Sequence, residues 1–146
     1  MSVTYITVDL RRLVVARAES ICEYCLIAEE DTFYGCEADH IISEKHGGPT
    51  LADNLAYACT FCNRAKGSDI GSLSIGGQFT RFFNPRLDRW ADHFSVMGSR
   101  IEAKSPIGEA TARILAFNAI QRILERSALV KLGRYPPRHA AAASRE

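Results

Sequence analysis

Apolar residues recur at three- and four-residue intervals near each end of the chain, and this period predicts two helices. The N-terminal stripe predicts a helix that begins at Asp9 and runs to about Ser20. The C-terminal stripe predicts one long helix over residues 106–132, which begins after a capping Ser105 and ends before Gly133. The stripes consist of Leu10, Leu13, Val14, Ala18 and Ile21 in the first helix, and of Ile107, Ile114, Phe117, Ile120 and Leu124 in the second.

The chain between these helices has the pattern of short strands and turns. Residues 33–42 predict one strand, and residues 55–58 predict a second, shorter strand. Residues 60–67 favour a helix that stops at Gly67, and the Gly- and Ser-rich residues 68–78 predict a turn or a surface linker. Together these elements predict an α+β fold.

The chain has 146 residues, of which 47% are apolar and 24% are charged, as in one soluble globular domain. A membrane span needs about 20 apolar residues, whereas the longest apolar stretch is Ile114–Ile120. Charged residues among the first twelve interrupt the apolar core of a signal peptide, so we expect a cytoplasmic protein without membrane partners. We expect one domain over residues 1–137, with a core at 9–67 and an extension at 79–137, followed by a disordered tail over 138–146.

Charge is distributed unevenly, although the formal net charge is only +1. Residues 1–70 hold 6 Lys and Arg against 11 Asp and Glu, whereas residues 71–146 hold 12 against 6. The acidic half suits cations and the basic half suits phosphate, with two solvated faces as the alternative. Arginines alternate with aromatic residues over 79–90, where Arg86 and Arg89 are candidates for contacts with phosphate.

Four of the five cysteines form two Cys-x-x-Cys pairs, Cys22 with Cys25 and Cys59 with Cys62. Two such pairs supply the four thiolates of a tetrahedral zinc site, and a site closed in this way is structural rather than catalytic. The pairs are 33 residues apart, so folded structure must lie between them. Buried cysteines or a single redox pair are the alternative, and Cys36 is expected to be a core thiol.

Polar residues between and after the cysteine pairs suggest a second, catalytic centre. Asp39 and His40 are consecutive, Asn54 follows fourteen residues after His40, and Asn63 comes directly after the last paired cysteine. Carboxylate and amide oxygens are ligands for a hard divalent cation, and a neutral histidine can take a proton from water. A base and a metal ion are what hydrolysis of a phosphodiester needs.

Together these motifs resemble the HNH endonucleases of the zinc-containing ββα-metal type over residues 10–67. The resemblance implies a ββα core clipped by a four-cysteine zinc site, with an N-terminal helix and a long C-terminal helix. The motifs are Cys22-x-x-Cys25, Asp39-His40-Ile41, Gly47-Gly48, Asp53-Asn54-Leu55 and Cys59-x-x-Cys62-Asn63-x-x-Lys66-Gly67. Four later motifs resemble the C-terminal extension of a subgroup of bacterial HNH proteins. They are Phe83-Asn84-Pro85-Arg86, Trp90-Ala91-Asp92-His93-Phe94, Arg100-Ile101 and Gly108-Glu109-Ala110-Thr111.

The resemblance also implies roles for particular residues. His40 is implied to be the general base, and Asn54 is implied to brace a loop and orient His40. Asp39 and Asn63 are implied to bind the catalytic ion, with Asn63 where many members have the last histidine of the family name. Because an amide oxygen is a harder ligand than imidazole, we expect Mg²⁺ or Mn²⁺ there rather than zinc or nickel.

The function implied is metal-dependent hydrolysis of DNA phosphodiester bonds, with double-stranded DNA as the partner. Lys66, Arg86, Arg89 and His93 are expected to contact nucleic acid, with a plain surface lysine as an equal alternative for Lys66. One alternative function is a non-catalytic, zinc-stabilised module that binds nucleic acid, and another is a zinc scaffold for a protein partner. We expect Arg113, Arg122 and Arg126, on the predicted long helix, to form a solvated face.

Overall fold

A computed structural model describes residues 5–140, and its first element is the predicted N-terminal helix. Helix α1 (Val8–Ala18) begins at Thr7, whose side chain accepts a hydrogen bond from a backbone amide of the first turn. The helix ends two residues earlier than expected, because Glu19 and Ser20 have left-handed backbone conformations with φ of 54° and 58°. This turn directs the chain into the first cysteine pair.

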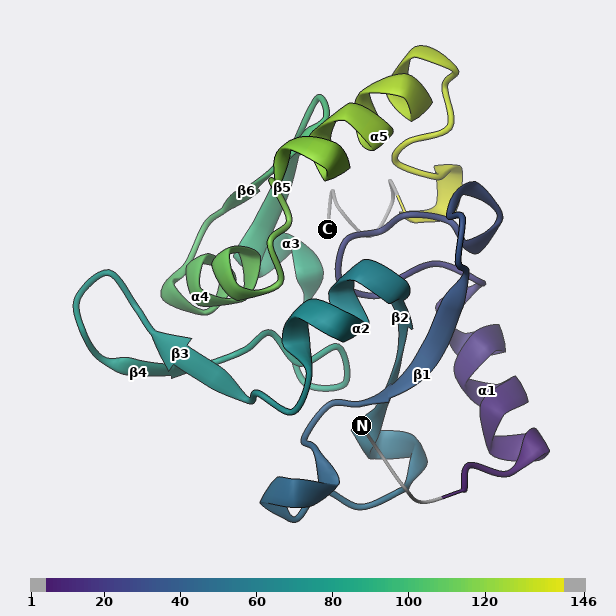
Figure 1. The fold of residues 1–146 in the computed structure, drawn as a ribbon, viewed down its shortest axis with the longest axis vertical. Helices are drawn as coiled ribbons and strands as arrows, with labels where there is room; N and C mark the ends of the chain where they lie inside the picture. The colour runs from purple at the N-terminus through teal and green to yellow at the C-terminus, as the bar shows by residue number, and fades with distance from the viewer. Residues whose placement is uncertain (1–4, 141–146) are drawn as a thin grey trace.

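Two antiparallel strands and a helix form the centre of the fold. Strand β1 (Cys36–His40) pairs along its whole length with β2 (Leu55–Cys59), and helix α2 (Thr60–Lys66) follows β2 directly. Figure 1 shows α1 and α2 on either side of the two strands. Strand β1 is shorter than predicted because the chain turns at Gly35, where φ is 76°. The predicted ββα core is otherwise confirmed.

Short 3-10 helices shape the loops around β1. Helix η1 (Glu29–Asp31) lies before the strand. Helices η2 (Glu44–His46) and η3 (Ala52–Asn54) lie in the connection from β1 to β2. Because this connection begins directly after His40, its conformation determines what surrounds the histidine side chain.

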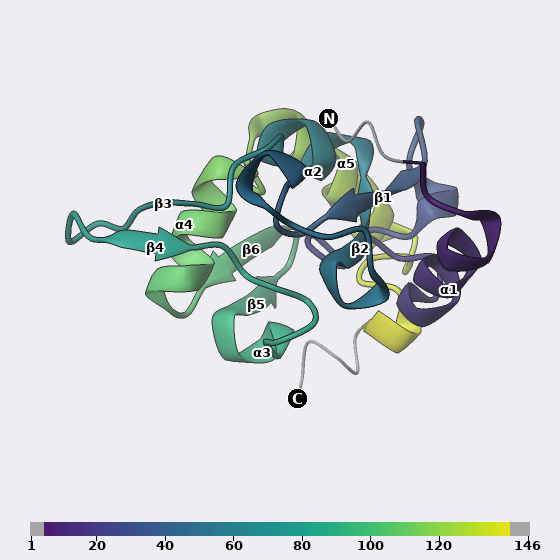
Figure 2. The same ribbon diagram turned by 90° about the horizontal axis from the view of Figure 1, so that it is seen from below.

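The C-terminal half contains two further hairpins. Strand β3 (Gly71–Leu73) pairs with β4 (Phe79–Arg81), and β5 (Phe94–Met97) pairs with β6 (Arg100–Ala103). The short helix α3 (Trp90–His93) precedes β5 directly. Figure 2 shows the β3–β4 hairpin projecting away from the rest of the protein, at the opposite end from α1. This hairpin begins where the sequence predicts only a turn or a linker.

The prediction of one long C-terminal helix is wrong, because the structure has two helices over these residues. They are α4 (Pro106–Ile114) and α5 (Ile120–Lys131). The backbone between them turns at Ala116, which has a φ of 53°. The side chain of Asn118 fixes this turn, because it accepts from the backbone N–H of Ile101 in β6 at 3.0 Å and donates to its carbonyl at 2.8 Å. The apolar stripe therefore does not form one continuous helical face.

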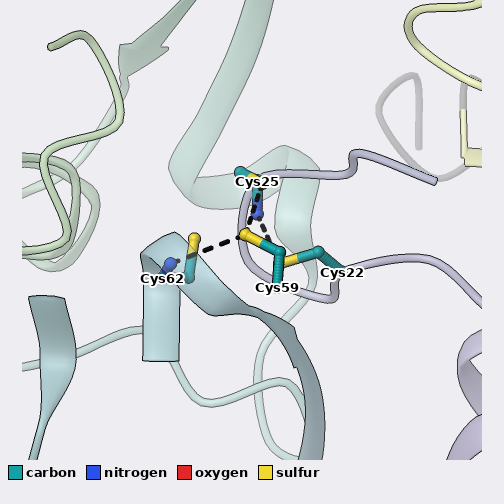
Figure 3. A group of neighbouring side chains, drawn as sticks. All are labelled: Cys22, Cys25, Cys59 and Cys62. Atoms are coloured by element: carbon teal, nitrogen blue, oxygen red, sulfur yellow. Dashed lines mark hydrogen bonds between the residues drawn. The ribbon is translucent and has the colours of Figure 1, made fainter. Parts of the chain in front are cut away.

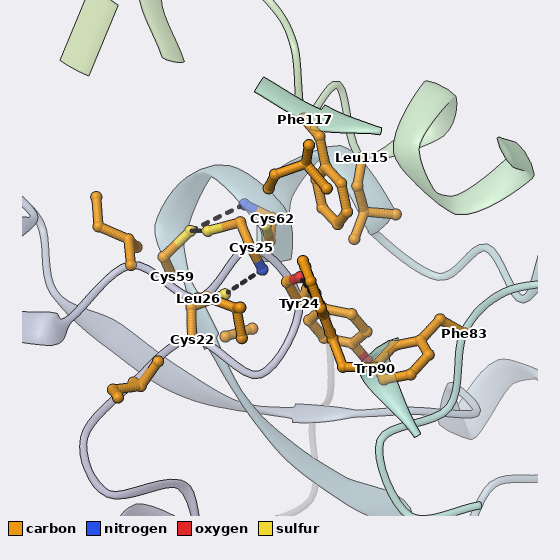
Figure 4. Close-up of a cluster of buried hydrophobic side chains, with 14 of the residues drawn as sticks. Cys22, Tyr24, Cys25, Leu26, Cys59, Cys62, Phe83, Trp90, Leu115 and Phe117 are labelled. Atoms are coloured by element: carbon orange, nitrogen blue, oxygen red, sulfur yellow. Dashed lines mark hydrogen bonds between the residues drawn. The ribbon is translucent and has the colours of Figure 1, made fainter. Parts of the chain in front are cut away.

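A cluster of buried side chains joins the two halves of the chain. It includes Tyr24 from the first cysteine pair together with Phe83, Trp90, Phe94 and Phe117 from the C-terminal half. Figure 4 shows the rings of Tyr24, Trp90 and Phe83 beside the cysteines. The indole N–H of Trp90 also donates to the backbone carbonyl of Tyr24 at 2.8 Å. The C-terminal extension is therefore part of the core that supports the cysteine pairs.

The C-terminal end of the described chain packs against this core, because Ala140 is buried. Residues 141–146, which make up most of the tail predicted over 138–146, lie outside the described residues. Within residues 5–140, we find no helix with the length and apolar character needed to cross a bilayer.

Candidate functional site

The two cysteine pairs meet at one buried site, as their spacing predicts. Cys22 and Cys25 lie in the loop after α1, Cys59 ends β2, and Cys62 lies in the first turn of α2. Their four sulfur atoms all lie within 4.8 Å of one another, and Figure 3 shows them converging. The sulfurs of Cys25 and Cys59 are 3.7 Å apart, close to the edge of about 3.8 Å of a tetrahedron with Zn–S bonds of about 2.3 Å. The site therefore fits a zinc ion.

Backbone N–H groups are directed at the sulfurs within each pair. The N–H of Cys25 donates to the sulfur of Cys22 at 3.5 Å, and the N–H of Cys62 donates to the sulfur of Cys59 at the same distance. The second bond also caps the N-terminus of α2. Such bonds favour the negatively charged thiolates that bind a metal ion. The β1–β2 hairpin brings the two pairs together across the 33 intervening residues.

Arg122 of α5 lies beside the sulfurs, which differs from the solvated face expected for it. Its guanidinium donates to the sulfur of Cys62 at 3.1 Å and lies 3.7 Å from that of Cys59, and the residue is 5% exposed. Burial alone would lower the pKa of Arg122, but the thiolates raise it above its usual value. Zn²⁺ with four thiolates carries about two negative charges, and Arg122 offsets one of them.

The carboxyl group of Asp39 lies in the core, between the sheet and α2. Its Oδ2 accepts a hydrogen bond from the phenol of Tyr24 at 3.2 Å and lies 3.1 Å from the Lys66 ammonium. The same ammonium donates to the backbone carbonyl of His40 at 2.9 Å. Burial raises the pKa of Asp39, and the positive charge of Lys66 opposes this shift only in part.

The imidazole of His40 has different neighbours from Asp39. Its Nε2 lies 2.8 Å from the hydroxyl of Thr50, and that hydroxyl donates to a carboxylate oxygen of Glu44 at 3.3 Å. Because the hydroxyl proton of Thr50 is donated to Glu44, the Thr50 oxygen accepts a hydrogen bond from Nε2–H of His40. The proton on Nε2 leaves Nδ1 as the ring nitrogen that can accept a proton.

Asn54 closes the loop that carries Thr50. Its side-chain oxygen accepts from the backbone N–H of Ile42 at 2.9 Å, and its amide donates to the carbonyls of Ile42 and Pro49, both at 2.9 Å. The backbone passes so close here that a Cβ added at Gly48 would lie 1.8 Å from the Ile42 carbonyl oxygen. Asn54 therefore acts on His40 indirectly, by fixing the loop whose Thr50 bonds to the imidazole.

Asn63 lies on α2 and faces β1. Its amide donates to a carboxylate oxygen of Glu37 at 3.0 Å. Glu37 and Asp39 are two residues apart on β1, so their side chains lie on the same face of the sheet. Glu37 is not part of any motif that predicts a site residue, although alternation along the predicted strand places it on the face of Asp39. Asp39, Glu37 and Asn63 thus form a row of oxygen-bearing side chains.

Three of the four residues predicted to contact nucleic acid have partners within the protein, namely Lys66, Arg86 and His93. Lys66 is only 1% exposed, because its ammonium is bound to Asp39 and to the backbone of β1. Arg86 donates to the Leu55 carbonyl at 3.1 Å and forms an ion pair with Glu23. Neither side chain is directed at solvent, which differs from the expectation.

His93 and Arg89 differ in their surroundings. The Nδ1 of His93 lies 2.6 Å from the hydroxyl of Ser105, and its ring packs edge-to-face with Phe83. Arg89 is exposed. Of the four predicted contacts, Arg89 is the one whose side chain is open to a partner in solution.

Comparison with protein families identifies the central part of the chain. Residues 22–69 match the family model described as HNH endonuclease, which confirms the resemblance of this segment. The matched segment contains the four clustered cysteines, Asp39, His40, Asn54 and Asn63. No match was found among curated proteins or among solved structures. The family match points to a nuclease that acts on nucleic acids.

Proposed function

We propose that this protein is a metal-dependent endonuclease that hydrolyses DNA phosphodiester bonds, with His40 as the general base. The observation that carries the proposal is the position of Asp39 and His40 at the end of β1, inside the segment that matches the HNH endonuclease family. The four-cysteine site supports the proposal, because it fixes both elements that flank this position. A zinc ion bound there would be structural, since four thiolates leave no ligand position for water.

The oxygen-bearing side chains on the Asp39 face of β1 fit a hard divalent ion, Mg²⁺ or Mn²⁺. Asp39 offers a carboxylate oxygen and Asn63 an amide oxygen, which are the ligand types that such ions prefer. Glu37 lies on the same face and can hold a water molecule or the ion itself. When bound, the ion stabilises negative charge on the phosphate and on the leaving oxygen.

His40 activates the attacking water in this mechanism. Its Nε2–H is held by Thr50, whose hydroxyl is held by Glu44, so the ring is oriented with Nδ1 available. Nδ1 takes a proton from water as the water oxygen bonds to phosphorus, the bond between phosphorus and the leaving oxygen breaks, and the leaving oxygen takes a proton from solvent. Asn54 keeps the Thr50 loop in place through its bonds to Ile42 and Pro49. Its role is thus to orient the base without touching the reacting atoms.

A plasmid-nicking assay with purified protein tests the proposal. Supercoiled DNA is incubated with the protein in Mg²⁺, in Mn²⁺ and in a chelator of divalent ions. Conversion to nicked or linear DNA only with a divalent ion supports the nuclease. Salt-dependent DNA binding without cleavage in any of these ions would favour the non-catalytic binding module. Absence of both would favour a scaffold for a protein partner.

Replacing Asp39 by Asn is expected to raise the Mn²⁺ concentration needed for half-maximal cleavage by about tenfold or more, because the charged ligand is lost. Because burial raises the pKa of Asp39, its carboxylate takes up a proton at a higher pH than an exposed carboxylate does. The Mn²⁺ requirement of the wild-type protein should therefore increase as the pH falls. Metal titrations at two pH values measure both effects, with thermal melting to confirm that Asp39→Asn is folded.

Arg89 and Arg86 are expected to respond differently to replacement by Ala. Arg89→Ala should weaken DNA binding equally across sequences and reduce the slope of log K against log salt by about 0.9, the contribution of one phosphate contact. Arg86→Ala should instead lower the free energy of unfolding by about 1.5–3 kcal/mol, because Glu23 and the Leu55 carbonyl lose a charged donor. Binding isotherms at several salt concentrations and urea unfolding separate the two. Weaker DNA binding in Arg86→Ala together with lower stability in Arg89→Ala would contradict these assignments.

A further inference from the structure

Among the residues that the structure describes, those that bind the carboxylate of Asp39 do so through one of its two oxygens. Oδ2 binds both the Tyr24 phenol and the Lys66 ammonium, at 3.2 Å and 3.1 Å. Within residues 5–140, Oδ1 has no hydrogen-bond donor, and no fully buried side-chain oxygen or nitrogen lacks a partner. Oδ1 therefore keeps contact with solvent. The two oxygens of one buried side chain thus differ, one fixed by the protein and one open to a ligand.

Tyr24 has little freedom to move. It lies between Cys22 and Cys25, and its side chain is completely buried. Its backbone carbonyl accepts the indole N–H of Trp90, and its ring packs edge-to-face with Phe83 at a centroid distance of 6.4 Å. The position of the phenol hydroxyl is therefore determined by the first cysteine pair and by the core of the C-terminal extension.

Lys66 approaches the same oxygen from the second cysteine pair. It lies one helical turn after Cys62 on α2, and its side chain is 1% exposed. The two donors to Asp39 thus come from the two halves of the four-cysteine site. A zinc ion that joins the pairs fixes the separation of these donors, and with it the orientation of the carboxylate.

We propose that Tyr24 is a positioning residue which, together with Lys66, holds Oδ2 of Asp39 so that Oδ1 is presented to the divalent ion. This inference rests on the proposed function, in which Asp39 is a ligand of that ion. A carboxylate that is already oriented loses less conformational freedom when it binds a cation, and its affinity for the cation is higher. Through Tyr24, the structural zinc site contributes to the affinity of the catalytic site.

Tyr24→Phe tests the inference, because it removes the hydroxyl and keeps the buried ring. The dissociation constant for Mn²⁺ is measured on the zinc-loaded protein by electron paramagnetic resonance, and the site is identified as the Mn²⁺ signal that Asp39→Asn removes. We expect Tyr24→Phe to raise this constant about tenfold, as is usual for loss of a partner of a metal ligand. Zinc content should stay at that of the wild type.

Tyr135→Phe is the matched control. The hydroxyl of Tyr135 is also buried and donates to the backbone carbonyl of Cys25 at 2.7 Å, so it supports the same loop without touching Asp39. Its Mn²⁺ affinity is expected to stay within about twofold of the wild type. In cleavage assays, Tyr24→Phe should raise the half-saturating Mn²⁺ concentration and keep most of the rate at saturation, since a merely destabilised protein would lose both.

The outcomes separate this inference from the proposed function. Unchanged Mn²⁺ affinity in Tyr24→Phe, or an equal loss in Tyr135→Phe, would overturn the positioning role and leave the nuclease proposal intact. Loss of zinc from Tyr24→Phe would also overturn it, by showing a purely structural hydroxyl. A wild-type protein without any Mn²⁺ signal that depends on Asp39 would overturn both the positioning role and the assignment of Asp39 as a ligand.

Discussion

Withdrawal of zinc from the four-cysteine site is expected to unfold the protein. Structural zinc contributes about 10–16 kcal/mol of apparent binding free energy in small zinc domains, whereas a whole domain is stable by only about 5–15 kcal/mol. Without the ion, four buried thiols and the guanidinium of Arg122 would stay in the core without their main partner. Elemental analysis should give about one zinc per chain. Circular dichroism after chelation in mild denaturant should show loss of structure that zinc restores.

The fifth cysteine provides the control for this experiment. Cys36 lies directly opposite Cys59 in the β1–β2 pairing, but it is not one of the clustered thiols. Cys59→Ser should therefore abolish tight zinc binding and cooperative unfolding, while Cys36→Ser should retain one zinc ion. A metal-free protein with an unchanged melting temperature would show that the cysteines contribute to the core only as apolar side chains.

Replacing His40 by Ala is expected to lower the cleavage rate by about two to four orders of magnitude, the usual contribution of a general base. Zinc content and DNA affinity should be nearly unchanged, because neither depends on the imidazole. Single-turnover cleavage rates at saturating Mn²⁺ measure the effect separately from metal binding.

His46 is a matched control, because it is exposed and lies in the same connection between β1 and β2. His46→Ala should cleave at close to the wild-type rate. The cleavage rate of Thr50→Val should lie between those of His46→Ala and His40→Ala, since this change removes the hydroxyl that holds Nε2 but leaves the base. Wild-type activity in His40→Ala would contradict the assignment, and His46 and His93 would be the next bases to test.

The features that the sequence predicts well depend on short-range patterns. The four-cysteine cluster follows from the spacing of two Cys-x-x-Cys pairs, and α2 follows from a helical segment that ends at Gly67. Strand β2 is predicted almost to its last residue, because its short apolar run is buried on both faces. Each of these features is encoded within a few consecutive residues, where local conformation and burial agree.

The features that the sequence does not reveal depend on contacts between distant segments. An arginine on an amphipathic helix is usually solvated, whereas Arg122 is buried with the sulfur of Cys62, 60 residues away, and the carbonyl of Leu115 as acceptors. Lys66 is buried and Arg86 is half-buried, because Asp39 and Glu23 pair with them across the fold. The division of the long C-terminal helix likewise depends on Asn118, which binds a neighbouring strand. Local patterns contain no information about such partners.

The boundaries of the family match do not coincide with the boundaries of a self-sufficient unit. Inside residues 22–69, the carbonyl of Tyr24 and the sulfur of Cys62 accept hydrogen bonds from Trp90 and Arg122, which lie beyond the segment. Transplanted alone onto another scaffold, the segment would expose an apolar face and keep uncompensated thiolate charge. Recombination would therefore keep this segment intact only together with a C-terminal partner that supplies equivalent donors.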